Sequence, residues 1–210
     1  YDRSIAMQIA FPEDQQRLKI NLSNSIFADN YQGCSNFQMI VIISLNDTLS
    51  IQNCTFTDNS GGSNTITIWG NTYLKNNIFW NPEMPYEIQL YYSSIAGPCS
   101  LYLENNDLRG GFAGIVNMSP FNTIIWGSGN VNTDPLFRMQ TDQPYSLSDN
   151  SPLIDAGILN PTEINVGLYD VALNERFWDG DGDGIARIDI GAYEYQQMLS
   201  PYNLNSEVNY

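Results

Sequence analysis

The chain contains no histidine and only two lysines, Lys19 and Lys75, among its 210 residues. The absence of histidine removes the usual general base, the Ser-His and Cys-His catalytic pairs and most zinc sites. Charged residues make up only 15% of the chain, and the 23 acidic residues outnumber the 8 basic ones. The resulting net charge of −15 repels phosphate backbones, so we do not expect nucleic-acid binding.

Long apolar segments are also missing. The longest runs only from Met39 to Leu45, which is too short to span a bilayer, so membrane insertion is not expected. The three cysteines, Cys34, Cys54 and Cys99, lack the spacing of a metal site. We interpret them as small buried hydrophobic residues, and one disulfide with a free thiol is the alternative.

Asparagine, in contrast, is abundant, because its 25 residues outnumber all the aspartates and glutamates together. Four segments of the chain align with one another. Each has a short alternating strand, then Asn, and two or three residues later Phe or Leu. The anchor residues are Asn24, Asn53, Asn76 and Asn105, at spacings of 29, 23 and 29 residues, and Gly129 takes the same place in a degenerate fifth copy.

This repeat predicts an all-β fold, a parallel β-helix (β-solenoid) of about five to six coils. Equivalent positions of successive coils stack about 4.8 Å apart. Asn at a coil corner tolerates left-handed backbone angles, and its amide can bond to the Asn above and below. We therefore expect the four anchor asparagines to form a structural ladder, and Phe27, Phe56 and Phe79 to stack inside the coil.

The composition divides the chain into parts. Residues 134–194 hold 12 acids and 3 bases, against 10 acids and 5 bases in residues 1–133. We predict four parts: an N-terminal strand or lid (1–17), the coils (18–133), a C-terminal cap with an acidic metal loop (134–196) and a tail (197–210).

The predicted cap is expected to cover the open apolar core at the end of the coils. A solenoid end exposes unpaired strand edges and an open core. Prolines stop strand pairing in this part of the chain. We expect four apolar side chains to plug the end of the core: Leu136, Phe137, Leu153 and Ile154.

Three strings in the last third carry a family resemblance: Asn-Thr-Asp-Pro-Leu-Phe (132–137), Tyr-Ser-Leu-Ser-Asp-Asn-Ser-Pro-Leu-Ile-Asp-Ala-Gly (145–157) and Asp-Ile-Gly-Ala-Tyr-Glu-Tyr (189–195). With the repeats, they resemble the C-terminal part of bacterial right-handed parallel β-helix surface proteins of the choice-of-anchor or polymorphic outer-membrane type. The resemblance implies a right-handed helix that these strings close, and a secreted protein attached to a cell surface. That group has no common catalytic site, so the resemblance implies fold and location rather than an activity.

The sequence Asp-Gly-Asp-Gly-Asp-Gly at 179–184 is the strongest candidate site. Carboxylates at alternate positions separated by glycines can converge on one hard cation. We predict a structural calcium site, and a solvated acidic turn is the alternative. Asp189 comes at position 11 of the loop, one short of the usual acid, and Asp170 or Glu175 are candidates to join from outside. The predicted ligands are Asp179, Asp181, Asp183, the carbonyl of Ile185, and Asp189.

We therefore expect a secreted, cell-surface structural or adhesive module that is not an enzyme and that binds a glycan or another surface partner. Tyr86, Tyr91 and Tyr92 are candidates for stacking on sugars. One alternative is a filament subunit that stacks head to tail as a homo-oligomer through an uncapped end.

The other alternative is a carbohydrate-active enzyme, either a polysaccharide lyase or a glycoside hydrolase. The motif sets of pectin-type lyases and polygalacturonases are missing, since there is no Gly-His-Gly and no Arg-x-Lys string. The remaining pair for glycoside hydrolysis is Asp107 with Asp58 or Glu104.

Overall fold

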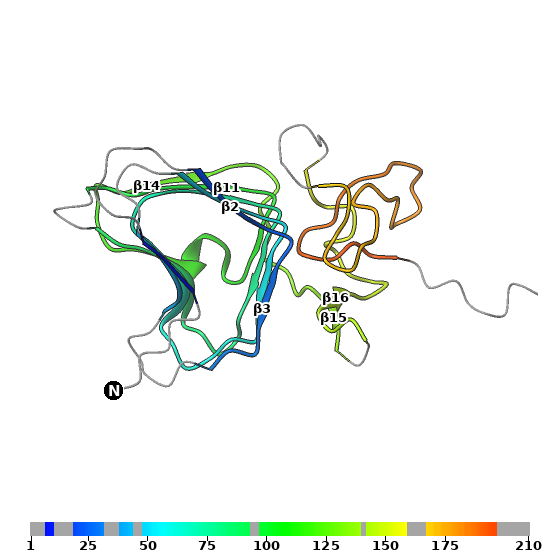
Figure 1. The fold of residues 1–210 in the computed structure, drawn as a ribbon, viewed down its shortest axis with the longest axis horizontal. Coiled ribbons are helices and arrows are strands. Elements are labelled where there is room, and N and C mark those ends of the chain that lie inside the picture. The colour runs from blue at the N-terminus through cyan, green and yellow to red at the C-terminus, as the bar shows by residue number, and fades with distance from the viewer. Residues whose placement is uncertain are drawn as a thin grey trace, which may run out of the picture.

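The computed structural model describes residues 7–10, 19–31, 38–43, 48–92, 97–139, 142–158 and 167–196. Parallel strands wind into a β-solenoid, which confirms the predicted fold (Figure 1). Sheet A contains β1 (Met7–Ala10), β4 (Gln38–Ile43), β7 (Asn64–Ile68), β10 (Tyr86–Leu90) and β13 (Ile115–Asn117). Sheet B contains β2 (Lys19–Ser23), β5 (Thr48–Gln52), β8 (Asn71–Lys75), β11 (Ser100–Glu104) and β14 (Thr123–Trp126). Sheet C contains β3 (Ile26–Ala28), β6 (Thr55–Thr57), β9 (Ile78–Trp80) and β12 (Asp107–Leu108).

Each turn of the solenoid passes through sheets B, C and A in that order. Three turns are described with all their side chains: β5–β6–β7, β8–β9–β10 and β11–β12–β13. Successive strands of sheets A, B and C pair in parallel and in register, so Leu49, Thr72 and Leu101 stack on one another. None of the described residues forms a helix long and apolar enough to cross a membrane.

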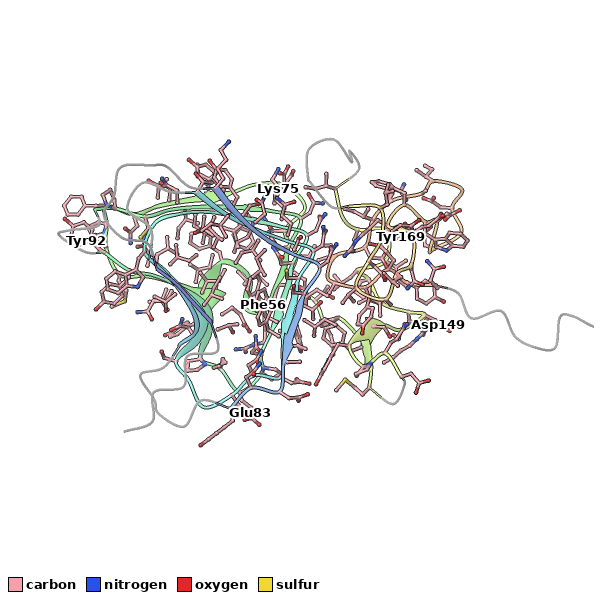
Figure 2. The ribbon with its side chains drawn as sticks, viewed as in Figure 1. Phe56, Lys75, Glu83, Tyr92, Asp149 and Tyr169 are labelled. Carbon is pink, nitrogen blue, oxygen red and sulfur yellow. The ribbon has the colours of Figure 1, made fainter. Side chains whose placement is uncertain are left out.

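The alternation seen in the sequence separates an inner from an outer face. In β5, β8 and β11 every second residue is buried, because side chains of a strand point to opposite faces. Phe27, Phe56 and Phe79 form the predicted stack, with ring centroids 4.9 and 4.6 Å apart and nearly parallel planes. Phe56 lies inside the coil and Lys75 outside it (Figure 2).

The corner between sheets B and C has the predicted left-handed backbone. Asn24, Asn53, Asn76 and Asn105 have φ angles between 50° and 53°, and Gly129 has φ 70° in the same place. Asparagine tolerates this conformation better than other residues with a Cβ. The fixed asparagine of the repeat is therefore explained by the corner.

The continuous amide ladder, however, lies one residue later than we predicted. Asn106 Oδ1 accepts hydrogen bonds from the backbone N–H and the amide of Asn77, at 3.0 and 2.9 Å. Asn130 Oδ1 accepts both from Asn106 at 3.0 Å. In the predicted row, Asn76 donates to Asn53 at 3.2 Å, but the Asn105 amide donates outward to the carbonyl of Ala156.

A second ladder at the corner between sheets C and A was not predicted. Asn59 Oδ1 accepts from the backbone and amide of Asn30, and Asn81 Oδ1 accepts both from Asn59, at 2.8 to 3.1 Å. Asn81 then donates to the wholly buried carboxylate of Glu87, which Arg109 pairs at 3.0 Å. These bonds satisfy the polar groups of Asn59, Asn81 and Glu87, which are all buried.

The C-terminal region (residues 134–196) packs against the side of the solenoid and not on its end (Figure 1). The Gly191 N–H donates to the Asn76 carbonyl, and the Ala192 N–H donates to Thr55 Oγ1. A Cβ on Gly191 would lie 2.6 Å from the Ile78 side chain, so only glycine allows this close approach. The small antiparallel pair β15 (Phe137–Arg138) and β16 (Ser146–Leu147) belongs to this region.

The prediction that this region plugs the end of the core is therefore wrong. Phe137, Leu153 and Ile154 pack with Ile78 on the outer face of sheet C, and Leu136 is 40% exposed. The physical reason is that sheet C carries apolar side chains on its outer face, which need cover.

A short internal segment lies at the C-terminal end of the core instead. The 3₁₀ turn η1 (Gly111–Gly114) lies within the outline of the coil, in contact with β10, β12 and β13 (Figure 1). Phe112 meets Trp126 edge to face at 5.7 Å, and Trp126 packs on the core.

Candidate metal centre

The Asp-Gly loop folds through its own carboxylates. Asp179 accepts hydrogen bonds from the N–H groups of Gly182 and Gly184, at 2.8 and 2.9 Å. Asp181 accepts from the N–H of Asp183, two residues on, at 2.9 Å. Such Asx turns are the local preference of aspartate, and both glycines have positive φ, which side chains disfavour. The alternating sequence therefore gives a tight, acidic loop.

The fold adds a third carboxylate to this loop. Asp155, Asp179 and Asp181 each offer one carboxylate oxygen, and these three atoms lie within 4.8 Å of one another. Asp155 is 7% exposed, and its Oδ2 accepts from the N–H groups of Gly180 and Asp181 at 2.8 Å. Its Oδ1 is buried and has no hydrogen-bond partner among the described residues. An open buried acceptor of this kind can be satisfied by a cation or a proton.

This set differs from the one predicted. Asp183 pairs with Arg187 at 2.9 Å, and Ile185 is 54% exposed. Asp189 points into the region, where it accepts from the N–H groups of Asp155 and Tyr195 at 2.8 and 2.5 Å. Neither Asp183 nor Asp189 belongs to the cluster of three carboxylates.

A chain of buried charges links the cluster to the solenoid. The Asp189 N–H donates to Glu194 Oε2 at 2.9 Å, and Glu194 Oε1 pairs with Arg176 at 2.6 Å. Arg176 is completely buried and donates to Asn24 Oδ1 at 2.7 Å. The Asp-Gly loop and the first coil are therefore joined through one polar network.

Acids exceed bases in this network. The buried carboxyl groups of the C-terminal region are Asp155, Asp170, Asp189 and Glu194, and the one buried base among its described residues is Arg176. Burial raises the pKa of Asp189 to about 7 and the pKa of Glu194 well above its usual range. Burial also raises the pKa of Asp155. The cause is desolvation, which disfavours the charged form, so an additional positive charge would stabilise this region.

The three carboxylates could hold a calcium ion. Calcium binds six to eight oxygens at about 2.3–2.6 Å, so oxygens around one ion lie within about 5 Å of one another. A hollow of about 490 Å³ next to Asp181 leaves room for the remaining ligands. Asp149 and Asn150 also line that hollow and add oxygen atoms to it.

The carboxylates considered for glycoside hydrolysis lie in different surroundings. Glu104 pairs with Lys75 at 3.0 Å on sheet B, and Asp58 lies at the corner after β6. Asp107 is buried in β12, where its Oδ1 accepts from the Thr133 N–H and burial raises its pKa to about 8.

The candidate sugar-stacking tyrosines lie among other aromatic rings. Tyr91 stacks on Trp69 with ring centroids 4.3 Å apart, and Tyr92 lies 5.8 Å from Phe121. Tyr86 is 43% exposed at the start of β10.

The two cysteines that the structure describes are free and buried. Burial raises the pKa of Cys54 to about 12 and that of Cys99 to about 11, so both thiols are unreactive. Cys34, the predicted lid residues other than Met7–Ala10, and the tail at 197–210 lie outside the described residues.

The fold thus defines a parallel β-solenoid with a laterally attached acidic region. No protein-family model, curated protein or solved structure matches the chain.

Proposed function

We propose that this chain is a non-catalytic structural and adhesive module of a bacterial cell surface, held together by a calcium ion in its C-terminal region. The observation that carries the proposal is the excess of buried carboxylates next to the cluster of Asp155, Asp179 and Asp181. One divalent cation there would compensate charge that Arg176 alone does not balance.

The proposed location follows from the metal. Calcium sites of extracellular modules are commonly weak, with dissociation constants of about 10⁻⁴–10⁻³ M, so they fill outside the cell. The resemblance of the three C-terminal strings (132–137, 145–157 and 189–195) to those of secreted β-helix surface proteins supports the same location. The low content of bases and the net charge of −15 favour neutral surface partners over polyanions.

The proposed structural role follows from the ladders. Buried amides bonded from coil to coil stabilise a rigid scaffold, on which loops and aromatic side chains can bind a partner. In the described coils, Glu87 and Glu104 are paired with bases. Carboxylates engaged in this way serve the structure, which supports a non-catalytic module.

Calcium titration tests the proposal. We expect calcium binding by calorimetry, a higher melting temperature in calcium than in excess chelator, and slower hydrogen exchange in residues 167–196. Asp181→Asn should abolish these effects. Asp183→Asn removes the same charge from the same loop but from a side chain paired with Arg187, so it should retain them. Identical melting in calcium and in chelator would refute the metal site.

The adhesive part has a separate test. Beads coated with the chain should be retained on films of neutral extracellular polysaccharide, and the polysaccharide should stay uncleaved. Release of reducing ends would favour the enzyme alternative instead.

Head-to-tail assembly is a second candidate, favoured by the lateral position of the C-terminal region. Within the described residues, β1 and β14 at opposite ends of the solenoid each pair on one side only. Sheets A, B and C begin with β1, β2 and β3 and end with β13, β14 and β12, so a second copy stacked on either end could extend all three sheets. Light scattering should then show growth with concentration, whereas a constant monomer mass would exclude it.

A further inference from the structure

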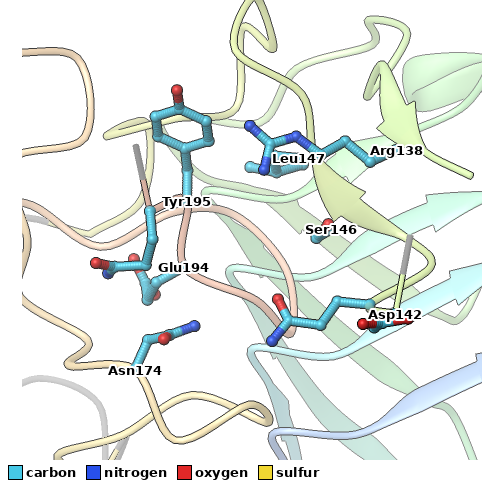
Figure 3. A pocket seen from close by; sticks show the side chains of 9 residues that line it. Arg138, Asp142, Ser146, Leu147, Asn174, Glu194 and Tyr195 are labelled. Atoms are coloured by element: carbon cyan, nitrogen blue, oxygen red, sulfur yellow. The ribbon is translucent and has the colours of Figure 1, made fainter. Parts of the chain in front are cut away.

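A hollow of about 380 Å³ lies in the C-terminal region between the β15–β16 pair and the loops that follow residues 170 and 190 (Figure 3). It is separate from the hollow next to Asp181, although Tyr195 borders both. Its volume falls at the lower end of the range for small-molecule sites, about 300–1,000 Å³. Six of its lining side chains carry polar groups that could position or contact a ligand: Arg138, Asp142, Ser146, Asn174, Glu194 and Tyr195.

One wall of this hollow is fixed by a buried carboxylate. Asp170 is 4% exposed and accepts from the Asn174 backbone and amide at 2.8 and 3.0 Å. Its Oδ2 also accepts from the Glu194 N–H at 2.8 Å. Arg176 and the Asp189 N–H hold the Glu194 carboxylate. Asn174 and Glu194 are therefore held in position before a ligand arrives, which reduces the entropic cost of binding.

Polar atoms facing the hollow still lack partners. Asn174 Oδ1, the Ser146 hydroxyl and the Asp142 carboxylate have no hydrogen-bond partner among the described residues. Arg138 lies over the Tyr195 ring, 5.1 Å from its centroid, and pairs with Asp149. The site thus offers fixed acceptors, a hydroxyl and a guanidinium beside the Leu147 side chain and the Tyr195 ring.

The charges select the class of ligand. Both guanidinium groups near the hollow are already paired, Arg138 with Asp149 and Arg176 with Glu194, so an anion would find no free positive charge. A ligand rich in neutral hydroxyls fits better, since each hydroxyl both donates and accepts. We infer that this hollow binds a neutral sugar unit of a glycan.

This inference rests on the proposed adhesive function and names its ligand class, but it has an independent test. Saturation-transfer NMR on the full chain in calcium would use methyl glucoside, methyl galactoside, methyl mannoside and N-acetylglucosamine, with glucuronate and glucosamine as charged probes. We expect a neutral sugar to bind with millimolar affinity and the charged probes to bind more weakly. Asn174→Ala should weaken binding about tenfold, as expected for the loss of one strong hydrogen bond.

Matched variants make the result decisive. Glu175→Gln changes the neighbouring exposed residue and should leave sugar binding unchanged. Asp142→Ala removes an exposed side chain with no partner among the described residues, so it should weaken binding without affecting folding if Asn174→Ala proves unstable. The inference falls if no neutral sugar binds to the folded chain or if the charged probes bind better. It also falls if Asn174→Ala and Asp142→Ala both bind the sugar as the wild type does.

A parallel measurement of calcium binding distinguishes a failure of this inference from a failure of the proposed function. Sugar binding that persists without any detectable calcium binding would support the pocket and refute the metal-stabilised module. Calcium binding without sugar binding would refute the pocket alone.

Discussion

The solenoid and the C-terminal region bury polar groups in two different ways. In the solenoid, neutral amides such as Asn77 and Asn106 repeat from coil to coil, and each rung satisfies the next. In the C-terminal region, carboxylates such as Asp189 and Glu194 meet one buried base, Arg176, through contacts that occur once. In the solenoid, each amide of the ladder finds its hydrogen-bond partner in the next coil. In the C-terminal region, the buried negative charge depends on a compensating positive charge.

The comparison separates two kinds of stability. An amide ladder has no titratable group, so its strength should not depend on pH or metal ions. A buried carboxylate network carries a desolvation cost that protons or a cation can relieve. We therefore expect the two regions to respond differently to the same change in solvent.

The largest effect should follow from removal of the buried base. Arg176→Met leaves Glu194 and Asn24 without their partner, and breaking a buried pair by removing one member costs about 3–5 kcal/mol. Hydrogen exchange followed by mass spectrometry should show faster exchange across residues 167–196. The matched change Arg187→Met breaks the exposed pair with Asp183 and should have a much smaller effect. Equal effects of the two changes would contradict the network.

A smaller effect is expected from a break in the neutral ladder. Asn77→Ala removes an amide that accepts from the Cys54 N–H and donates to Ile51 and Asn106, so the free energy of unfolding should fall by about 2–3 kcal/mol. Asn71, on the neighbouring strand, makes no side-chain hydrogen bond among the described residues, and Asn71→Ala serves as control. Urea unfolding measures both changes. A neutral Asn77→Ala would show that the ladder does not stabilise the solenoid.

The same contrast explains what the sequence could predict. Repetition makes a local pattern visible several times, so the strands, the phenylalanine stack and the left-handed corners followed from Asn24, Asn53 and their equivalents. We predicted the amide ladder one position too early, because the repeat is most regular at the left-handed residue. In the next row, whose amides do bond from coil to coil, Ser25 and Cys54 replace asparagine.

The C-terminal region could be predicted only in part. Its Asp-Gly loop is a local signal, but the contribution of Asp155 depends on contacts between distant segments. The lateral packing depends on the outward side chains of sheet C, such as Ile78, which the region covers. Arg176 and Glu194 occur in no repeated pattern, so their pairing was not visible in the sequence.

A change of pH should affect the C-terminal region through several buried carboxyl groups, whereas in the solenoid the buried Asp107, with a pKa of about 8, is the main group that responds. Asp189 has a pKa of about 7 in the folded chain, and the pKa values of Glu194 and Asp155 are also raised, against about 4 for unfolded carboxyl groups. Between about pH 4 and pH 7 the folded state then binds more protons than the unfolded state, so stability falls as pH rises.

Hydrogen exchange at pH 5 and pH 8, corrected for the intrinsic exchange rates, measures this dependence. Without calcium, residues 167–196 should be better protected at pH 5. Calcium should restore their protection at pH 8, because the ion replaces the protons. In the Asp107→Asn variant, which removes the buried carboxyl group of the solenoid, the strands β5 and β8 should be protected equally at both values. A parallel loss of protection in both regions would contradict the distinction between them.

The smallest expected effect comes from repairing the interruption at Cys54. Its thiol occupies the place of a ladder amide but lies 3.8 Å from the Leu22 carbonyl, whereas the Asn77 amide lies 2.9 Å from the equivalent carbonyl of Ile51. Cys54→Asn should extend the neutral ladder by one rung and raise the free energy of unfolding by about 0.5–1 kcal/mol. Urea unfolding under reducing conditions, with Cys54→Ala as the control that only removes the thiol, measures the gain. If both changes destabilise the chain equally, an added rung has no net value, and the solenoid owes its stability to the stacked apolar core rather than to its amides.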